Sequence, residues 1–548
     1  MTRVQPRRRF VPPLSVAAPA AASAFLFLLA FPPLPPLAVV ACLVPVALAA
    51  ARIADSSAPL GEGVRLGWWF GVFGFGATLY WIAIALSIYT KLAIAGYFGA
   101  LFVMAALAAG AIGTLVAARR VTRAPMAILL PVTWVAWEKL TEVLPQLGFP
   151  WLPLGLGVAK LSLLAQSAEL SGVHGASFWI AAINGLAVDA ILAQRQGARV
   201  MHAWGRRMAA AAAILAAVAG YGTWRMRTIV LRDVAPIAIV QPNVPQEDKW
   251  QESNRDRIVG MMSAGTRAAL AGGDPKLIVW PEVALPGYLV DHPDWRDTLS
   301  ALGRDGHVPI LFGVIDVRFN APPSSGAPMD FDYFNAAMLT DSLGRVGDYP
   351  PTRKQYLVPV VERVPFLNPK WFKSLKYFGG YGVGEGAVVY REPWGSFGVL
   401  ICYESIFPSQ ARAMRRNGAD LLLNITNDAW FGRSVAPWQH EAHMMLRAIE
   451  TRAGVVRSAN TGISTYIDPL GRSHGATGLF VPAARVYRAQ TSDATTPYVA
   501  LGDWVGWGCV IASAVLVVMA IRRRRGAPGA RASFYRLGGE VSAGTPNV

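Results

Sequence analysis

Three polar residues with complementary chemistry lie beside short apolar runs in the second half of the chain. Glu282 comes after the run over residues 277–280, and Cys402 directly follows the run over residues 398–401. Lys354 lies in a third such segment, residues 352–359. A thiol nucleophile needs a base that removes its proton and a cation that stabilises the oxyanion, and these residue types supply those parts. The residue types are those of a cysteine-nucleophile site, but their spacing alone justifies little, because surface charges and a buried core cysteine are the commoner meaning of such residues taken singly.

Cysteine usage sets Cys402 apart from the other two cysteines of the chain. Cys42 and Cys509 lie in long apolar runs, where a small lipid-buried side chain is the simplest interpretation. Cys402 is the only cysteine between residues 201 and 500, so no disulfide can form within that region. We therefore expect its thiol to be either buried or used.

The elements that must position these residues are short strands alternating with helices. Strand-like runs cover residues 235–240, 277–280, 310–314, 337–340, 397–402, 421–425 and 464–467. Helix-like stretches cover residues 254–271 and 408–417. Such alternation predicts one α/β domain with a layered sheet core, in which strand ends expose reactive side chains.

The chain as a whole is too apolar for a soluble protein of its size. Hydrophobic residues make up 53% of the sequence and charged residues only 16%. A bilayer-spanning helix needs about 20 mostly apolar residues. About eight spans are predicted, over residues 14–31, 34–51, 66–88, 92–117, 125–137, 173–192, 208–224 and 504–521.

The chain has a net charge of +17, and the positions of its arginines are those of membrane-topology signals. Arginines gather at the ends of apolar runs, at residues 7–9, 119–120, 206–207 and 522–525. This pattern argues against nucleic-acid binding and predicts a protein of the cytoplasmic membrane with both termini in the cytoplasm. Residues 229–497 then face the periplasm.

These features divide the chain into four parts. Residues 1–227 form an N-terminal transmembrane domain with seven spans, and residues 228–500 form the periplasmic catalytic domain. Residues 501–525 form a C-terminal transmembrane helix. Residues 526–548, rich in Gly, Ala, Ser and Pro, are expected to be a disordered cytoplasmic tail.

The local sequences around the three polar residues carry a family resemblance. Trp280-Pro281-Glu282, the Lys354 segment and Ile401-Cys402-Tyr403-Glu404 resemble, in that order, the nitrilase superfamily. Residues 240–250, 424–432 and 457–462, with 148–151 and 166–184 in the apolar half, narrow the resemblance to the apolipoprotein N-acyltransferase family. The resemblance implies an αββα sandwich beside membrane helices, with no cofactor.

In that family an acyl chain passes from a membrane phospholipid to the cysteine and then to the α-amine of a diacylglyceryl-modified N-terminal cysteine of an apolipoprotein. By matching position, the resemblance implies that Cys402 is the nucleophile and Glu282 the general base and then acid. Lys354 stabilises the oxyanion. We expect a monomer.

The resemblance also suggests four supporting residues. Glu362 matches a second family glutamate, although Val360-Val361 precedes it where the family usually has Phe-Gly. The backbone of Tyr403 can donate to the oxyanion, and Glu404 can order the Cys402 loop. Trp250 matches a tryptophan near the lipid entrance, with an interfacial anchor as the alternative.

Other interpretations are weaker. His440-Glu441-Ala442-His443 lacks the spacing of a zinc-protease motif, so no metal site is predicted. His307 or His440 could act as a base for Cys402, but nothing in the sequence connects either to it. The rival functions are a membrane-tethered amidase and a transporter or receptor with a non-catalytic sensor domain. Against the latter, the spans hold few ionisable residues.

Overall fold

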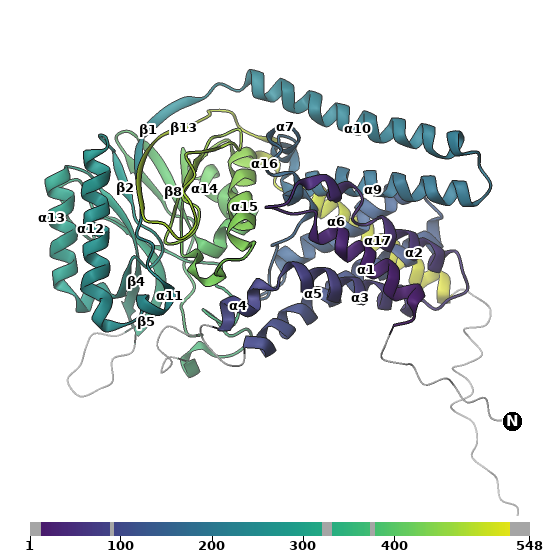
Figure 1. Ribbon diagram of the computed structural model, residues 1–548, viewed down its shortest axis with the longest axis horizontal. Coiled ribbons are helices and arrows are strands. Elements are labelled where there is room, and N and C mark those ends of the chain that lie inside the picture. The colour runs from purple at the N-terminus through teal and green to yellow at the C-terminus, as the bar shows by residue number, and fades with distance from the viewer. Residues whose placement is uncertain (1–11, 88–92, 321–330, 373–378, 526–548) are drawn as a thin grey trace, which may run out of the picture.

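The computed structural model describes residues 12–87, 93–320, 331–372 and 379–525. A bundle of apolar helices and a two-sheet α/β domain lie side by side along the long axis of the molecule (Figure 1). The tail predicted to be disordered, residues 526–548, lies outside the described residues.

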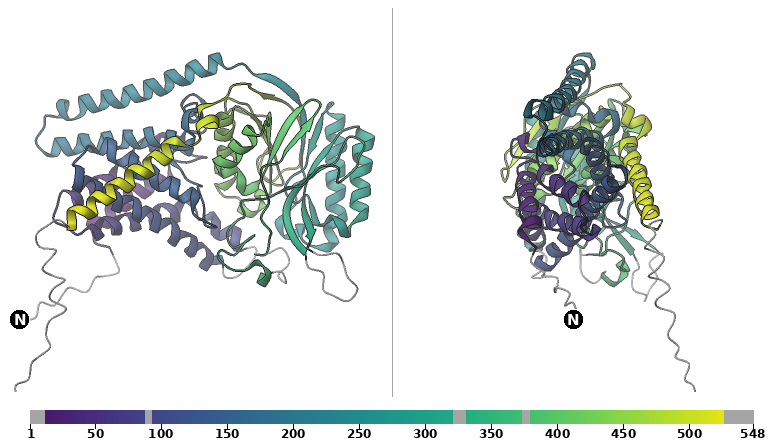
Figure 2. Two further views of the ribbon diagram at one scale, coloured as in Figure 1. Left: turned by 180° about the vertical axis from the view of Figure 1, so that it is seen from behind. Right: turned by 90° about the vertical axis from the view of Figure 1, so that its right-hand side faces the viewer.

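The bundle is built from the first 228 residues and the helix near the C-terminus. Its helices are α1 (Leu14–Leu28), α2 (Val44–Ala54), α3 (Leu60–Thr78), α4 (Trp81–Ser87), α5 (Ala93–Thr122), α6 (Met126–Val143), α9 (Val173–Arg195), α10 (Val200–Thr228) and α17 (Trp504–Arg525). Shorter turns connect them: η1 (Pro36–Val40), η2 (Leu154–Val158), α7 (Ser162–Ala165) and α8 (Ala168–Ser171). Figure 2 shows α17 returning along the outside of the bundle.

Within the described residues, four helices are long and apolar enough to cross a membrane: Pro36–Ala54, Ile94–Thr122, Val173–Arg195 and Trp504–Arg523. The pair α3 and α4 makes a fifth candidate, bent by 60°. The other predicted spans coincide with helices that fall short by length or composition. α1 has 15 residues, α6 contains Glu138, Lys139 and Glu142, and α10 is rich in alanine and carries several arginines. The count of eight spans therefore stays a prediction.

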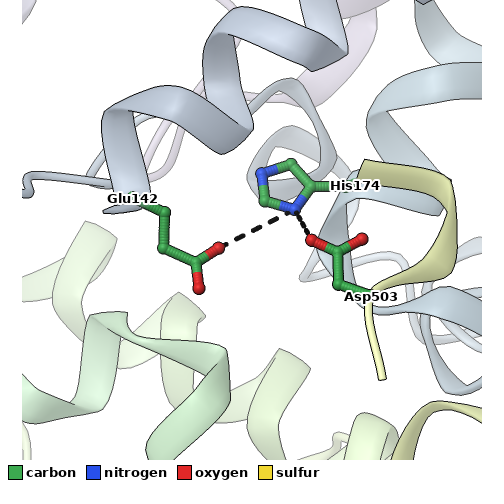
Figure 3. A group of neighbouring side chains, drawn as sticks. All are labelled: Glu142, His174 and Asp503. Carbon is green, nitrogen blue, oxygen red and sulfur yellow. Dashed lines mark hydrogen bonds and ion pairs between the residues drawn. The ribbon is translucent and has the colours of Figure 1, made fainter. Parts of the chain in front are cut away.

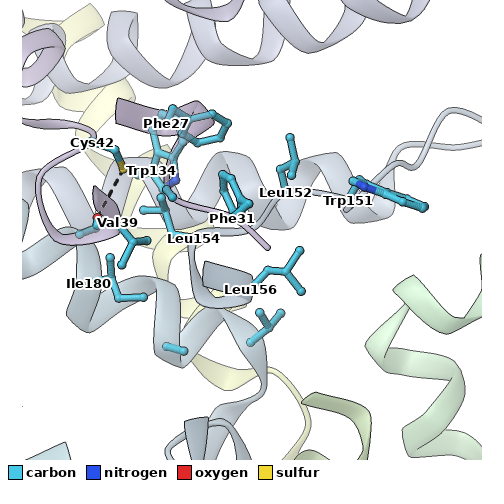
Figure 4. Packing of buried hydrophobic residues seen from close by; sticks show 14 of the residues in the cluster. Phe27, Phe31, Val39, Cys42, Trp134, Trp151, Leu152, Leu154, Leu156 and Ile180 are labelled. Atoms are coloured by element: carbon cyan, nitrogen blue, oxygen red, sulfur yellow. Dashed lines mark hydrogen bonds between the residues drawn. The ribbon is translucent and has the colours of Figure 1, made fainter. Parts of the chain in front are cut away.

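Close packing of α3 on α5 depends on small residues. A side chain at Gly67 would place its Cβ 2.5 Å from the carbonyl oxygen of Ala108, and one at Gly71 would lie 2.6 Å from the Cα of Ala105. Glycine at four-residue spacing lets two helix backbones approach in this way. Large apolar side chains, among them Phe27, Phe31 and Trp134, fill the rest of the bundle core (Figure 4).

The α/β domain contains two sheets that pack face to face. The first has the order β13-β1-β2-β4-β5-β6, with β3 beside β4, and the second has the order β12-β11-β10-β9-β8-β7. The strands of the first sheet are β1 (Arg232–Gln241), β2 (Leu277–Val279), β3 (Leu285–Tyr288), β4 (Ile310–Phe319), β5 (Phe331–Leu339), β6 (Thr352–Arg353) and β13 (Ala483–Thr491). Those of the second are β7 (Val389–Glu392), β8 (Gly395–Ile401), β9 (Leu421–Thr426), β10 (Gly454–Ala459), β11 (Thr465–Ile467) and β12 (Ser473–His474).

Helices cover the outer face of each sheet and give an α–β–β–α layering (Figure 1). They are α12 (Arg255–Ala271) and α13 (Pro293–Gly306) on the first sheet, and α14 (Pro408–Arg416) and α15 (Ala436–Thr451) on the second. Short helices complete the domain: α11 (Gln246–Lys249), η3 (Glu252–Asn254), η4 (Leu289–Asp291), η5 (Pro369–Phe372), η6 (Cys402–Ile406), η7 (Asp428–Phe431) and α16 (Pro497–Leu501). All seven predicted strand-like runs fall on strands, and both predicted helical stretches fall on helices, which confirms the α/β prediction.

The α/β domain is fixed to the bundle through buried polar contacts on α15 and its C-terminal end. The Arg452 guanidinium pairs with Glu169 of α8 at 2.6 Å and donates to the side chain of Gln166 at 2.7 Å. The indole of Trp151 donates to Gln439 at 2.8 Å. These groups are buried, so the two parts share one continuous interior.

A second buried polar cluster holds the start of α17 against the bundle (Figure 3). The imidazole Nδ1 of His174 lies 2.7 Å from Asp503 and 3.9 Å from Glu142. The ammonium of Lys139 lies 3.0 Å from Glu142 and 3.2 Å from Asp503. Although Glu142, His174 and Asp503 could together hold a metal ion, the lysine already supplies a positive charge between the two carboxylates.

We expect Lys139→Met to destabilise the protein by about 3 kcal/mol, because it leaves two buried carboxylates facing each other without a cation. The midpoint of thermal unfolding in detergent should fall clearly. Lys160→Met is the matched control, since that ammonium is more exposed and lies 4.0 Å from Glu441. Equal midpoints for the two variants would contradict this role for Lys139.

Candidate active site

The three predicted catalytic side chains come from the ends of three strands. Lys354 directly follows β6, Cys402 directly follows β8, and Glu282 comes three positions after the end of β2. Because β2 and β6 belong to one sheet and β8 to the other, the group bridges the two sheets. Glu282, Lys354 and Cys402 are 5%, 1% and 7% exposed, so they lie in a nearly dry environment.

Two carboxylates share the Lys354 ammonium. Its Nζ lies 2.9 Å from Glu362 and 3.4 Å from Glu282. The amide of Asn335 donates to the same two carboxylates, at 2.7 Å to Glu282 and 2.9 Å to Glu362. The second oxygen of Glu282 accepts the backbone N–H of Asn427 at 2.9 Å. The lysine is therefore held in place from both sides.

Cys402 occupies a strained turn between β8 and η6. Its φ is +49°, a left-handed conformation that non-glycine residues seldom adopt and that surrounding contacts must enforce. The Glu404 carboxylate supplies two of them, accepting the backbone N–H of Ile401 at 2.8 Å and that of Gln355 at 2.6 Å. Since Gln355 follows Lys354, this carboxylate ties the lysine segment to the cysteine turn.

His440 lies directly behind the cysteine turn, a connection that the sequence did not reveal. Its Nε2 is 3.2 Å from the carbonyl oxygen of Cys402 and 2.7 Å from the hydroxyl of Ser405. Its Nδ1 is 2.9 Å from Asp428, which also pairs with Arg457 at 2.7 Å. The imidazole contacts the backbone of Cys402, so the geometry suits it to hold the turn.

Burial and neighbouring charge set the protonation of the site. Burial raises the pKa of the Cys402 thiol well above its usual range, and the Glu282 carboxylate adds to that rise against the opposing effect of Lys354. Burial alone would lower the pKa of Lys354, but attraction to Glu362 and Glu282 outweighs it, so that pKa is raised. Burial raises the pKa of Glu404 to about 7, although its backbone donors oppose the rise. The resting site therefore holds a neutral thiol beside a charged ammonium.

The two predicted aromatic supports pack against different neighbours. The Tyr403 hydroxyl donates to the carbonyl oxygen of Gly148 at 2.5 Å, and its ring stacks on Phe149. Tyr403 therefore contacts the segment that follows α6. Trp250 packs against a small cluster with Val283 and Tyr381.

Sequence reasoning missed three polar residues of the site. Lys249 is buried and donates to the carbonyl oxygen of Glu282 at 2.9 Å, and burial lowers its pKa to about 8. Asn335 orders both carboxylates, as described above. Asn427 directly follows β9, the neighbour of β8, so the strand-end rule could have found it. Lys249 lies in the segment 240–250 that carried the family resemblance, but no sequence signal assigned it to the site, and none marks Asn335.

A cavity of about 340 Å³ joins these polar groups to the helical bundle. Glu282, Lys354, Cys402 and Lys249 lie at its polar end. Its remaining wall is largely apolar and comes from α4, α5 and the segment before η2, with residues such as Trp81, Leu86, Val103, Met104, Phe149 and Trp151. The Cys402 thiol thus opens onto a space suited to a hydrocarbon chain.

Two family descriptions match the chain. "Carbon-nitrogen hydrolase" matches residues 236–481, and "Apolipoprotein N-acyltransferase N-terminal domain" matches residues 23–186. Among solved structures, an amidase from Nesterenkonia sp. is 18% identical, with a TM-score of 0.33 over 49% of this chain and 94% of the amidase.

Similar full-length proteins carry one common name. The apolipoprotein N-acyltransferase of Geobacter metallireducens is 33% identical over 469 residues, which cover 84% of this chain and 87% of the relative. That of Chlorobaculum tepidum is 30% identical over 72% of this chain and 77% of the relative. On this likeness over nearly its whole length, the chain belongs to the apolipoprotein N-acyltransferase family.

Proposed function

We propose that this protein transfers a fatty acyl chain from a membrane phospholipid, through a thioester on Cys402, to an apolipoprotein. The acceptor is the α-amine of a diacylglyceryl-modified N-terminal cysteine. The observation that carries the proposal is the single cavity in which Cys402, Glu282 and Lys354 meet an apolar wall supplied by the helices. Both substrates are lipids, which accounts for a catalytic domain fused to a membrane bundle.

In the first step the Cys402 sulfur attacks the ester carbonyl of the phospholipid while Glu282 takes the thiol proton. Lys354 stabilises the negative charge that develops on the carbonyl oxygen. When the tetrahedral intermediate collapses, the C–O bond breaks and Glu282 returns the proton to the departing lysophospholipid oxygen. Because the resting thiol is neutral, this proton transfer has to accompany attack.

In the second step the neutral α-amine attacks the thioester carbonyl. An α-amine has a pKa of about 8, so a useful fraction is nucleophilic near neutral pH. Glu282 takes a proton from the attacking nitrogen and gives it to the departing thiolate, while Lys354 again holds the oxyanion. The C–S bond breaks, an amide forms and Cys402 regains its thiol.

The supporting residues keep this geometry rather than react. Glu362 and Asn335 orient the Lys354 ammonium, and Glu404 fixes the distance between the lysine segment and the cysteine turn. Tyr403 offers its backbone N–H to the oxyanion, and Trp250 lines the lipid entrance. The cycle uses side chains of this protein, the backbone N–H of Tyr403 and two lipid substrates.

The proposed arrangement in the cytoplasmic membrane has eight spans. Residues 1–227 and 501–525 cross or line the membrane, residues 228–500 face the periplasm, and both termini are cytoplasmic. The arginine clusters at the ends of apolar runs support this orientation. The protein acts as a monomer.

Acylation of a lipoprotein in cells that lack their own enzyme tests the proposal as a whole. We expect the chain to restore triacylated lipoprotein, which mass spectrometry of the lipoprotein N-terminus detects. Release of free fatty acid or ammonia without transfer would favour the amidase. The absence of any reaction would favour the non-catalytic sensor.

Cys402→Ala should abolish both transfer and the acyl adduct, whereas Cys42→Ala and Cys509→Ala should remain active. Cys402 lies at the polar end of the cavity, while Cys42 packs in the bundle core and Cys509 packs beside Val135 and Ala136. Mass spectrometry of the protein after mixing with phospholipid measures the adduct. An adduct on either of the other cysteines would overturn the assignment.

Glu282→Gln should block both steps, because each one needs a proton moved through the same carboxylate.

Lys354→Arg should keep the charge yet lose roughly a hundred- to a thousandfold in acylation rate, the usual effect of removing one oxyanion donor. A planar guanidinium cannot replace a compact ammonium between two carboxylates. Single-turnover acylation of Cys402 isolates the first step.

The control for Lys354→Arg is Lys276→Arg, at a half-exposed lysine paired with Asp274. It should acylate at the native rate. If Lys354→Arg does so as well, the lysine is a structural or headgroup contact and the proposed oxyanion role is lost.

Labelling of single cysteines tests the orientation. In a chain with Cys42, Cys402 and Cys509 replaced, a membrane-impermeant maleimide should label Asp274→Cys in cells with a permeabilised outer membrane. Arg523→Cys should react only after the cytoplasmic membrane is broken. Labelling of Arg523→Cys before lysis would reverse the proposed topology.

A further inference from the structure

The turn between α9 and α10 borders a basic pocket at the end of the bundle far from the catalytic cavity. The pocket has a volume of about 690 Å³ and lies between the α5–α6 connection, α9 and α10. Its charged and titratable lining consists of Arg119, Arg123, Asp189, His202, Arg206 and Arg207. Figure 1 shows the α9–α10 turn and the two sheets at opposite ends of the molecule.

The positive charge of the basic pocket is only partly compensated. Both oxygens of Asp189 accept backbone N–H groups at the start of α6, from Met126 at 2.9 Å and Ala127 at 3.0 Å, and Asp189 forms no ion pair with an arginine of the pocket. Asp55 neutralises Arg119 through two hydrogen bonds. For Arg123 and Arg206, the described part of the chain contains no carboxylate within ion-pair distance. The pocket therefore presents surplus cations to an outside anion.

An apolar wall adjoins these cations. Ile128, Leu186 and Leu192 line the same pocket, and Ile128 is 56% exposed. α10 is the least covered of the long helices here, since only Ala203, Ala211 and Gly222 of its 29 residues are buried. A ligand with a charged head and a hydrocarbon body would satisfy both features.

We propose that the basic pocket binds an anionic phospholipid, which packs between α9 and α10. Guanidinium groups match phosphate oxygens in a bidentate manner, and basic pockets between membrane helices recognise anionic headgroups. The acyl chains lie against the apolar wall and cover α10. Because α10 leads into β1 within a few residues, the lipid steadies the segment that joins the bundle to the catalytic domain. This site is separate from the donor site and does not depend on the proposed acyl transfer.

A free phosphate could contact the same guanidinium groups but would leave the apolar wall bare. The arginines could also serve only as topology signals, in which case any anion preference would be diffuse. The experiment has to separate these two cases from a built lipid site. The chain offers a matched control in Arg195 and Arg199, which are exposed near the same turn and do not line the pocket.

The full-length protein in neutral detergent is mixed with phosphatidylglycerol, with phosphatidylcholine of the same acyl chains, or with inorganic phosphate. Native mass spectrometry counts bound lipid, and thermal unfolding reports stabilisation. We expect phosphatidylglycerol to bind preferentially and to raise the unfolding midpoint. Arg123→Gln/Arg206→Gln should weaken its binding by roughly thirtyfold, whereas Arg195→Gln/Arg199→Gln should leave it unchanged.

Equal loss in the two double variants would show diffuse attraction and overturn the proposal. So would full stabilisation by inorganic phosphate, or equal binding of the two lipids. If the Arg123→Gln/Arg206→Gln variant fails to fold, the Arg123→Lys/Arg206→Lys variant tests the proposal instead. It keeps the charge and the topology signal, and the loss of the planar fork should still weaken phosphatidylglycerol binding several-fold. Native affinity in the folded lysine pair would contradict recognition by the guanidinium groups.

Discussion

Arg452 at the end of α15 and Glu169 of α8 form an ion pair in the interior between the two halves of the molecule. Both side chains are almost fully buried, and desolvating such a pair is costly unless every polar atom finds a partner. Arg225 and Tyr221 of α10 contact the same carboxylate, while Gln166 and the carbonyl oxygen of Pro469 accept from the guanidinium. These contacts restrict how the two halves can pack against each other. In the resulting arrangement, residues of α4 and α5 line the same cavity as Cys402.

Within the cavity, ion pairs and hydrogen bonds likewise restrict the side chains of the proposed triad. Lys354 serves two carboxylates, which would repel each other without it, and Lys249 brings a second positive charge to the carbonyl side of Glu282. With every carboxylate oxygen of Glu282 and Glu362 hydrogen-bonded, neither side chain is free to rotate toward the lipid. In the proposed cycle two groups of the triad change protonation during attack, the Cys402 thiol and the Glu282 carboxylate, while Lys354 keeps its charge. Preorganisation of this kind lets the site stabilise a developing charge without rearrangement.

Sequence alone predicted the α/β domain and brought forward the three residues that the structure gathers at one edge of the sheets. The domain prediction succeeded because hydrophobic periodicity and residue type are local properties of the sequence. The three residues could be grouped because strand ends converge in a layered sheet. The bend between α3 and α4 had no such signal, since no proline interrupts residues 66–88. It coincides with Trp81 packing on Trp151 and Phe431, both distant in sequence. The partners of Lys249, Asn335 and His440 likewise come from other elements, so their places depend on the assembled fold. The reacting roles themselves stay predictions from the family resemblance.

The proposed thioester would have to be kept from water until a lipoprotein binds, and the packing of the α/β domain on the bundle bears on how water is excluded. The face of the α/β domain that carries α15 is turned toward the bundle, so Trp151, Phe149 and Tyr403 form one aromatic wall across the boundary. In the proposed cycle Glu282 could activate water as well as an amine, so hydrolysis of the thioester would be limited by the access of water rather than by chemistry. The part of the bundle that lines the cavity would then favour transfer over hydrolysis by excluding water.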